Sequence, residues 1–277
     1  MSNANLAFRA PVVVLLGLVA AGCETTGAMN QAALQQVRAA QRNNIASISE
    51  VIRTNPTDAN ALNLRGVAHG QAGEYQKALA DFNAALQISP NYHQAYANRA
   101  LIHLRTNQVN AAMADYNRAI QLAPDYGVAY VGRGNLHRAM KNFTAAIEDY
   151  NRAIQIQADD PIAYFNRGLV YQAMNDHRGA IDDFTMALGM RPEEPEASFA
   201  RGSSYLAVNE YKKAYDDFVA VSNVKKDNHE VWTYRGRAAE GAGDPKEAAR
   251  AYKRALQISP YFRPANEGLS RVGRGEA

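Results

Sequence analysis

Apolar and small residues return along most of the chain with a fixed period of 34 residues. Five sets of positions share this period: prolines, small residues, alanines, aromatics and a second, mostly alanine set. Self-similarity at one period is typical of a repeat protein, in which each repeat is one supersecondary unit. In the order given, the members are Pro56, Pro90, Pro124, Pro192 and Pro260; Gly66, Ala100, Gly134, Gly168, Gly202 and Gly236; Ala78, Ala112, Ala146, Ala180, Ala214 and Ala248; Phe82, Tyr116, Tyr150, Phe184, Phe218 and Tyr252; and Ala85, Ala119, Ala153, Ala187, Val221 and Ala255.

Each repeat is predicted to hold two helices. The small residue lies in the first helix, and the alanine and aromatic positions lie in the second at helical spacing. Turn residues such as Gly73-Glu74 and Asn107-Gln108 separate the two. Proline then ends the second helix. The pattern therefore predicts an all-α fold without a sheet.

These positions resemble the tetratricopeptide repeat over residues 59–262. The resemblance implies a right-handed α-solenoid of six antiparallel helical hairpins, whose first helices line a concave groove. Small residues let the two helices of a hairpin approach closely. The predicted repeats are 59–92, 93–126, 127–160, 161–194, 195–228 and 229–262.

Elements on both sides of the repeats are expected to cap the solenoid, because its ends need polar covers. Ile48, Val51 and Pro56 keep the 34-residue register. Residues 31–58 are therefore predicted to form a degenerate leading hairpin or a capping helix. Residues 263–277 are predicted to supply a C-terminal cap, with a short helix over 265–272, and a tail.

The first 22 residues differ in kind from the rest. A polar start with one positive charge precedes an apolar run over 11–21, which is too short for a comfortable membrane span. Small residues then lead to Cys23, the one cysteine of the chain, so an intramolecular disulfide is excluded. We predict an export signal over 1–22 and a tether over 23–30.

The segment from Val19 to Cys23 resembles the lipobox of bacterial lipoproteins, with Ala20 where leucine is usual. The resemblance implies cleavage before Cys23 and lipidation of its thiol and freed amine, which anchors the protein in a membrane. The alternatives are an ordinary secretory signal, or a buried helix in which Cys23 is incidental. Glu24 stands where aspartate favours inner-membrane retention in enterobacteria, so the outer membrane is favoured.

Charge and motifs narrow the function classes. The formal net charge is +3 with both signs interspersed, so no basic face indicates nucleic acid. No nucleophile elbow, HExxH or phosphate loop is present. The sequence therefore favours a non-enzymatic protein without a cofactor.

One charged pattern repeats. An arginine precedes the small residue in every repeat, and an aspartate precedes the aromatic in five, with Ala251 in the sixth. The pattern predicts a structural ladder of ion pairs between helices; an anion-binding stripe is the alternative reading. The members are Arg65, Arg99, Arg133, Arg167, Arg201 and Arg235, and Asp81, Asp115, Asp149, Asp183 and Asp217.

A histidine series also follows the period. His69, His103 and His137 are continued by Tyr171 and Tyr205. Stacked helices lie about 8–10 Å apart, which strains shared metal ligation. We interpret the series as a packing position and expect no metal.

A second apolar face on the first helices is the candidate functional feature, because a helix that is apolar on two sides is buried on both or meets a partner. The groove lacks the Lys/Asn carboxylate clamp of chaperone-binding members, so an amphipathic helix or an extended peptide segment is the expected ligand. The alternative is a narrow groove that packs on itself. The predicted groove residues are Ala97, Leu101, Leu104, Val131, Ile162, Phe165, Leu169, Phe199 and Leu206.

Together these features predict a lipid-anchored adaptor that faces the periplasm and binds protein partners. The layout is similar to tetratricopeptide lipoproteins of the new lipoprotein I type, which implies cell-wall hydrolases or proteases as partners and leaves dimerisation open. A pilotin-type lipoprotein that assists a secretin or a type IV pilus is the second hypothesis. A metal-dependent envelope enzyme that uses the histidine series is the third.

Overall fold

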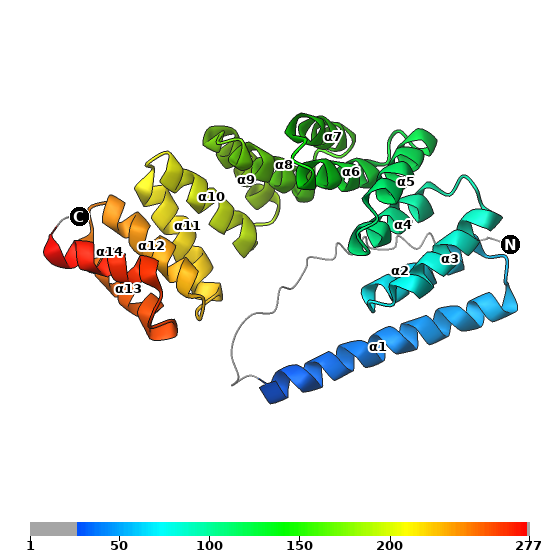
Figure 1. Ribbon diagram of the computed structural model, residues 1–277, viewed down its shortest axis with the longest axis horizontal. Helices are drawn as coiled ribbons and strands as arrows, with labels where there is room; N and C mark the ends of the chain where they lie inside the picture. Colours follow the sequence, from blue (N-terminus) through cyan, green and yellow to red (C-terminus); the bar gives the residue numbers. More distant parts are fainter. Residues whose placement is uncertain (1–26, 276–277) are drawn as a thin grey trace, which may run out of the picture. The chain divides into compact units, whose positions relative to one another are not determined.

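The computed structural model describes residues 27–275, and all regular secondary structure in this range is helical (Figure 1). The fold is the predicted all-α array of helical repeats. The helices are α1 (Gly27–Thr54), α2 (Ala59–Gln71), α3 (Tyr75–Ile88), α4 (His93–Arg105), α5 (Val109–Leu122), α6 (Gly127–Ala139), α7 (Phe143–Ile156), α8 (Pro161–Ala173), α9 (His177–Met190), α10 (Pro195–Ala207), α11 (Tyr211–Val224), α12 (His229–Gly241), α13 (Pro245–Ile258) and α14 (Arg263–Arg274).

The helix boundaries follow the 34-residue period throughout α2–α13. First helices of 13 residues alternate with second helices of 14 residues. One residue in the turn between the two helices has a positive φ in every repeat, and it is glycine or asparagine in five of the six. Glycine adopts this conformation freely and asparagine tolerates it, which favours a turn at this position. These residues are Gly73, Asn107, Lys141, Asn175, Asn209 and Gly243.

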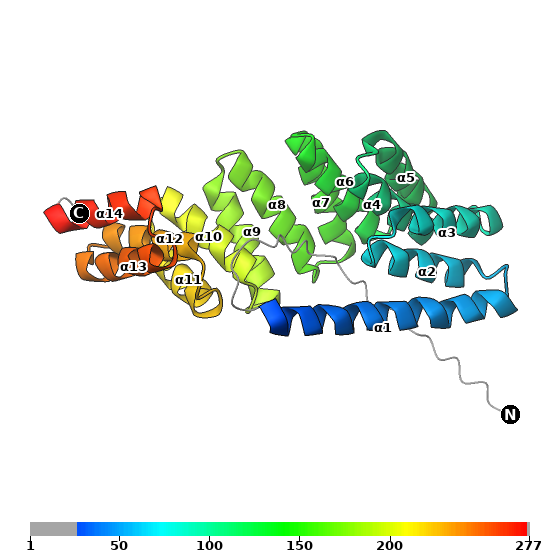
Figure 2. The ribbon, with the colours of Figure 1, turned by 60° about the horizontal axis from the view of Figure 1, so that its bottom comes forward.

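The described residues form two compact units, which meet in sequence between Gln108 and Val109. The first unit contains α1–α4, in which α2 packs against α1, α3 and α4. The second unit contains α5–α14, in which each helix packs mainly on its neighbours in sequence. Figure 2 shows the antiparallel course of successive helices within each unit.

The core of each hairpin is a close approach between the small residue of the first helix and the aromatic of the second. A Cβ built on Gly168 would lie 2.8 Å from the ring of Phe184, and one on Gly134 would lie 2.8 Å from the ring of Tyr150. Both rings are fully buried. A larger residue in the first helix would push the two helices apart, which explains why small residues recur at this position.

The leading element is a single helix of 28 residues, α1, rather than a hairpin. Its last turns fill the place of a second helix: Ile52 packs on Leu62, and Ser49 accepts a hydrogen bond from Arg65. Ile48 therefore lies in the register expected for it. Of the two forms expected for residues 31–58, a hairpin or a capping helix, the structure has the single helix. The export signal, Cys23 and most of the tether lie outside the described residues.

The trailing element, α14, is longer than the predicted 265–272 and closes the last hairpin. Ala265 is fully buried against the core of α12 and α13. Arg271 donates to both carboxylate oxygens of Glu240, and the Tyr252 hydroxyl donates to the same carboxylate at 2.5 Å. The end of the array is thus covered by a helix with a charged outer face. Among the described residues, no helix has the length and hydropathy that crossing a membrane requires.

Candidate partner-binding face

Four of the predicted arginine–aspartate pairs are present with two-pronged geometry. Arg167 donates through Nε and Nη2 to the two carboxylate oxygens of Asp183, at 2.8 and 2.6 Å. Bidentate pairs of this kind are stronger and more specific in geometry than single neutral hydrogen bonds. The same contact joins Arg65 to Asp81, Arg133 to Asp149 and Arg201 to Asp217. We call these arginines, together with Arg99 and Arg235, the arginine stripe.

Each arginine of the stripe also donates backwards, to the second helix that precedes it in sequence. Arg167 Nη1 donates to Asn151 at 2.5 Å, and Arg133 Nη1 donates to Asn117 at 2.7 Å. One guanidinium therefore joins its own hairpin to the preceding second helix. The sequence analysis missed these acceptors, although Asn83, Asn117 and Asn151 recur at 34 residues beside the aromatic. The remaining acceptors are Ser49 for Arg65, Asn83 for Arg99, Thr185 for Arg201 and Ser222 for Arg235.

The sixth repeat keeps its arginine although the aspartate is replaced by Ala251. Arg235 Nη2 donates to Glu247 at 2.5 Å, and Glu247 lies one helical turn before Ala251 on the same face. The Tyr215 hydroxyl also donates to Glu247, at 3.0 Å. The ladder therefore extends to the last hairpin through a different acid, which the sequence analysis did not predict.

Aromatic rings cover the guanidinium groups. Arg133 and Arg167 lie over Tyr130 and Tyr164, three residues earlier on the same helix, with the guanidinium carbon 5.7 and 5.6 Å from the ring centre. Trp232 holds Arg235 in the same way, at 5.0 Å. Such contacts favour the cation and reduce its contact with water.

Most donors of the arginine stripe find their acceptors within the protein. The side chain of Arg167 is 19% exposed and that of Asp183 is 6% exposed. Burial raises the pKa of the Asp183 carboxyl, and the hydrogen bonds from Arg167 oppose that rise. Pairing with aspartate raises the pKa of Arg65, Arg133, Arg167 and Arg201. Each arginine of the stripe donates to at least one side chain of the protein, although Arg235 Nε is buried without an acceptor, so the geometry favours the structural reading over an anion site.

Each histidine of the series contacts a side chain of its own hairpin. His69 Nδ1 lies 2.5 Å from Glu74, and His103 Nδ1 lies 2.9 Å from Gln108. His137 Nε2 approaches Asp149 at 3.9 Å, and Tyr171 covers Arg167. Within residues 27–275, no group of three or more potential metal ligands is assembled.

The nine predicted groove residues divide into three classes of exposure. Ala97 is buried, Leu101 is 38% exposed, and the other seven are half-buried. In the second unit, Val131 packs against the cluster around Tyr150, Phe165 and Leu169 against that around Phe184, and Phe199 and Leu206 against that around Phe218. The ring centres of Phe165 and Phe184 are 5.8 Å apart. These side chains therefore pack partly on their own hairpins. The alternative in which the groove packs on itself is thus correct for part of their surface.

Two apolar side chains that the sequence analysis did not select are as exposed as Leu101. Leu64 on α2 and Val128 on α6 are each 39% exposed. We use the term apolar face for the exposed and half-buried apolar side chains of the first helices. In the first unit these include Leu64, Val67, Leu101 and Leu104; in the second they include Val128, Val131, Ile162, Phe165, Leu169, Phe199 and Leu206.

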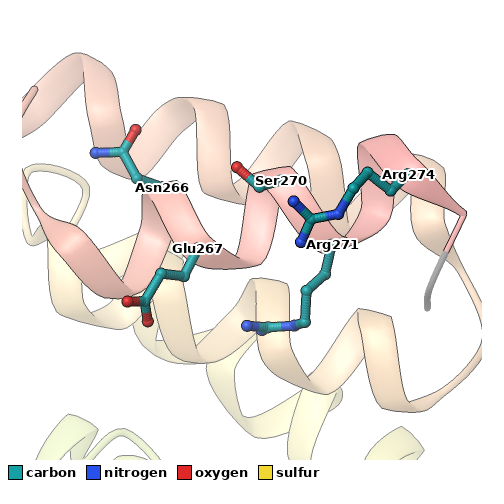
Figure 3. Close-up of a pocket in the computed structure, with 5 residues that line it drawn as sticks. All are labelled: Asn266, Glu267, Ser270, Arg271 and Arg274. Carbon is teal, nitrogen blue, oxygen red and sulfur yellow. The ribbon is translucent and has the colours of Figure 1, made fainter.

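A polar hollow lies on α14, away from the apolar face. It has a volume of about 520 Å³ and is lined by side chains of this one helix (Figure 3). Of these, Arg271 points toward the neighbouring helices, where it pairs with Glu240. Because one helix supplies the whole lining, the hollow is a surface feature rather than an enclosed site. The lining residues are Asn266, Glu267, Ser270, Arg271 and Arg274.

The repeated hairpins, the small-residue contacts and the apolar first-helix face define a helical-repeat protein-interaction scaffold. Models of the tetratricopeptide repeat match residues 59–92, 93–126 and 229–262, and further TPR repeat models match 134–175 and 165–220. The chain belongs to the tetratricopeptide repeat family. Proteins of this family are generally non-catalytic scaffolds that bind other proteins. A comparison with curated proteins found no match.

Solved structures share the fold at low sequence identity. The structure of pilF from Pseudomonas aeruginosa matches with a TM-score of 0.69 and 19% identity, over 77% of this chain and 97% of that one. PilW, described as a type IV pilus biogenesis factor, matches with a TM-score of 0.65 and 17% identity, over 77% and 97%. YrrB, described as having an unusual peptide-binding site, matches with a TM-score of 0.61 and 19% identity, over 67% and 96%.

A further match is a chain of the APC/C hetero-tetramer Cut9-Hcn1, with a TM-score of 0.66 and 18% identity. The match covers 84% of this chain, which spans less than half of the other, 46%. At these identities the likeness concerns the fold alone.

Proposed function

We propose that the protein is a lipid-anchored adaptor of the bacterial cell envelope, which faces the periplasm and binds protein partners on its apolar face. The binding role rests on a difference between two sets of side chains on the first helices: the arginines bind partners within the chain, and several apolar side chains do not. The arginine stripe meets its partners within the chain, whereas Leu64, Leu101 and Val128 remain more than a third exposed. Exposed apolar side chains that recur on the first helices of each unit are typical of an interaction surface.

The expected ligand follows from the chemistry of that surface. The side chains are branched aliphatic and aromatic, and they lie half-buried on successive helices. Such a surface binds an amphipathic helix, or an extended segment that presents spaced apolar side chains. Similarity to the peptide-binding protein YrrB supports the same ligand class.

Site-specific photo-crosslinking tests the binding face. A photoreactive residue at Val128, on α6, is expected to cross-link a partner in cell-envelope extracts. The matched control places the same residue at Met186, which is 47% exposed on the second helix α9. Equal cross-linking from both positions would contradict the assignment of the face.

The membrane anchor rests on the lipobox-like segment that ends at Cys23. Two or more acyl chains anchor a protein stably, since each buried methylene contributes about 0.8 kcal/mol. Globomycin treatment, or Cys23→Ala, is expected to leave unprocessed precursor in the cell. If the precursor is processed normally in treated cells, or in cells that produce the variant, the lipid anchor is contradicted. We place the anchor in the outer membrane on the ground that Glu24 follows the cysteine.

Two partner classes follow. Cell-wall hydrolases or proteases follow from the layout shared with tetratricopeptide lipoproteins. Pilus or secretin assembly is favoured by the similarity to PilW, whose description names type IV pilus biogenesis. Mass spectrometry of the Val128 cross-links separates the two: hydrolases or proteases support the first class, and secretin or pilin subunits support the second.

The third reading, a metal-dependent enzyme, finds less support. The histidines of the series contact side chains of their own hairpins instead of converging on one point. Elemental analysis of the purified protein tests it directly, and stoichiometric zinc or another transition metal would revive that reading.

A further inference from the structure

Arg133 and Arg138 lie on the same first helix, α6, and they differ in their partners. Arg133 donates to both carboxylate oxygens of Asp149 and to Asn117. Arg138 is half-buried, and its Nε is buried without a hydrogen-bond partner. Among the described residues, no carboxylate forms an ion pair with Arg138. A charge that is partly removed from water without an opposite charge costs free energy, so an added carboxylate beside Arg138 would be stabilising.

The last hairpin shows the same position with a charged partner. Glu240 on α12 follows Arg138 by three periods of 34 residues. Arg271 on α14 donates to both oxygens of the Glu240 carboxylate, and the Tyr252 hydroxyl donates to the same group at 2.5 Å. An acid, a tyrosine and a guanidinium from three successive helices therefore form a complete cluster.

The corresponding cluster at Arg138 is incomplete. Tyr150 supplies the tyrosine, and burial raises the pKa of its hydroxyl to about 12. The positive charge of Arg138 opposes this rise in pKa, because the guanidinium lies near the hydroxyl. Leu169, a half-buried residue of the apolar face, stands where the last hairpin has Arg271. A cation and a tyrosine are therefore present, and α8 supplies no opposite charge at this position.

The repeat that follows α6 and α7 shows that this position reaches the next first helix. Gln172 on α8 donates to the carbonyl oxygen of Ala200 and to the hydroxyl of Ser204, both on α10. The counterpart of Ser204 on α8 is Val170, whose side chain has no polar atom. Arg138 therefore lacks on α8 the hydroxyl that Gln172 finds on α10.

Arg138 lies at one end of the apolar face of the second unit. Val128 and Val131 occupy the first turns of α6, and Arg138 occupies the last turn. Val131 and Arg138 are seven residues apart, so they share one side of the helix and lie about 10 Å apart along its axis. The face on α6 therefore begins with aliphatic side chains and ends with a cation.

We propose that Arg138 binds a carboxylate of the partner segment that the apolar face holds. The inference rests on the proposed function and adds a charge requirement to it: the segment combines apolar side chains with an acidic group. The acid is an aspartate or glutamate side chain, or the C-terminal carboxylate. Beside Arg138 and Tyr150 it would repeat the pairing of Glu240 with Arg271, with the two charges exchanged. Guanidinium and carboxylate bind through two parallel hydrogen bonds, which fixes the position of the segment as well as its charge.

Selection from a library of random peptides displayed on phage tests the charge requirement, with the full chain in mild detergent as the target. The wild type is expected to enrich peptides that combine apolar residues with aspartate or glutamate. Arg138→Glu is expected to enrich the same apolar pattern with lysine or arginine. The fold accommodates an acid at this position, since Glu240 holds it in the last hairpin. The matched control, Arg152→Glu, changes an exposed arginine of the second helix α7 and is expected to select as the wild type does.

One synthetic peptide from the wild-type selection supplies a second measurement, by fluorescence anisotropy. Replacing its acidic side chain by the corresponding amide should weaken binding to the wild type roughly tenfold. The same replacement should change binding to Arg138→Met less than about twofold, because that variant has no charge to lose. If amidation of the peptide C-terminus has the larger effect, the bound group is the C-terminal carboxylate. Arg138→Met retains the apolar stem of the side chain, so it keeps the test decisive if Arg138→Glu folds poorly.

Two outcomes separate this inference from the proposed function. Apolar peptides without an acidic residue, selected alike by the wild type and Arg138→Glu, would overturn the role of Arg138 and leave the binding face in place. A selection that Val128→Glu does not change, or one that enriches no peptide, would contradict the apolar face itself and the inference with it.

Discussion

The arginine stripe and the apolar face lie on the same first helices, and they differ in where their side chains find partners. Arg167 meets Asp183, Asn151 and Tyr164, all within the chain. Val128, on α6 of the same unit, remains 39% exposed. The first surface joins hairpin to hairpin, and the second is available to another molecule. A repeated charged residue is thus a structural device here, and the apolar face is the candidate for function.

The largest effect on stability is expected at Asp183, the buried carboxylate that pairs with the arginine stripe. Asp183→Ala leaves Arg167 without its charged partner and should lower the free energy of unfolding by about 3 kcal/mol. Adding Arg167→Met should restore about 2 kcal/mol, because no charge is then left unpaired. Chemical denaturation measures both. The neighbouring exposed residue supplies the control, since Asp182→Ala should change stability by less than about 0.5 kcal/mol. An equal loss at both aspartates would contradict the ladder.

The last repeat provides a second test of the ion pairs, because Arg235 pairs with a glutamate at another position of the second helix. Glu247→Ala should lower the free energy of unfolding by about 2 kcal/mol, since Arg235 loses its carboxylate partner. Adding Ala251→Asp, which restores the acid of the other repeats, should recover about 1 kcal/mol. Thermal and urea denaturation of the two variants test the substitution. A double variant no more stable than Glu247→Ala would show that the acid at 251 cannot replace Glu247.

Alanine substitutions at two glycines of neighbouring helices test the close helix contacts. Their expected effects on stability are smaller and opposite in sign. Gly168→Ala should lower the free energy of unfolding by about 1–2 kcal/mol, because a Cβ would lie 2.8 Å from the buried ring of Phe184. Gly189→Ala, in α9, should instead raise it by about 0.5 kcal/mol, since nothing lies within 4 Å of that Cβ and alanine favours the helix. The opposite signs are the measurable result, and the same sign for both would count against the packing account.

The repeat was predictable from the sequence because every structural position recurs at one spacing. The pairing of Arg65 with Asp81 followed from charges at a constant separation. The acid of the last repeat was not predicted, because Glu247 reaches Arg235 from one turn away and only packing reveals that reach. For the leading element the sequence left a hairpin and a capping helix open. Ala39-Ala40, where the regular repeats have their positive-φ turn residue, favours the continuous helix that is observed.

The exposure of the apolar face was less predictable than its location. Whether Phe165 is free depends on the ring of Phe184 on another helix, so periodicity alone could not divide the nine groove residues into buried, half-buried and exposed. Val128 was missed because its neighbours on α6 are glycine and alanine, which weakens the apolar pattern. The groove as a binding site stays a prediction.

The binding affinity of a cross-linked partner for point variants of the face tests the central claim most directly. Val128→Glu with Ile162→Glu should weaken binding at least tenfold and leave the thermal unfolding midpoint close to that of the wild type, because both side chains lie outside the buried core. Met186→Glu, on a second helix, should bind as the wild type does. Unchanged affinity for the double variant, or an equal loss for Met186→Glu, would contradict partner binding on the apolar face.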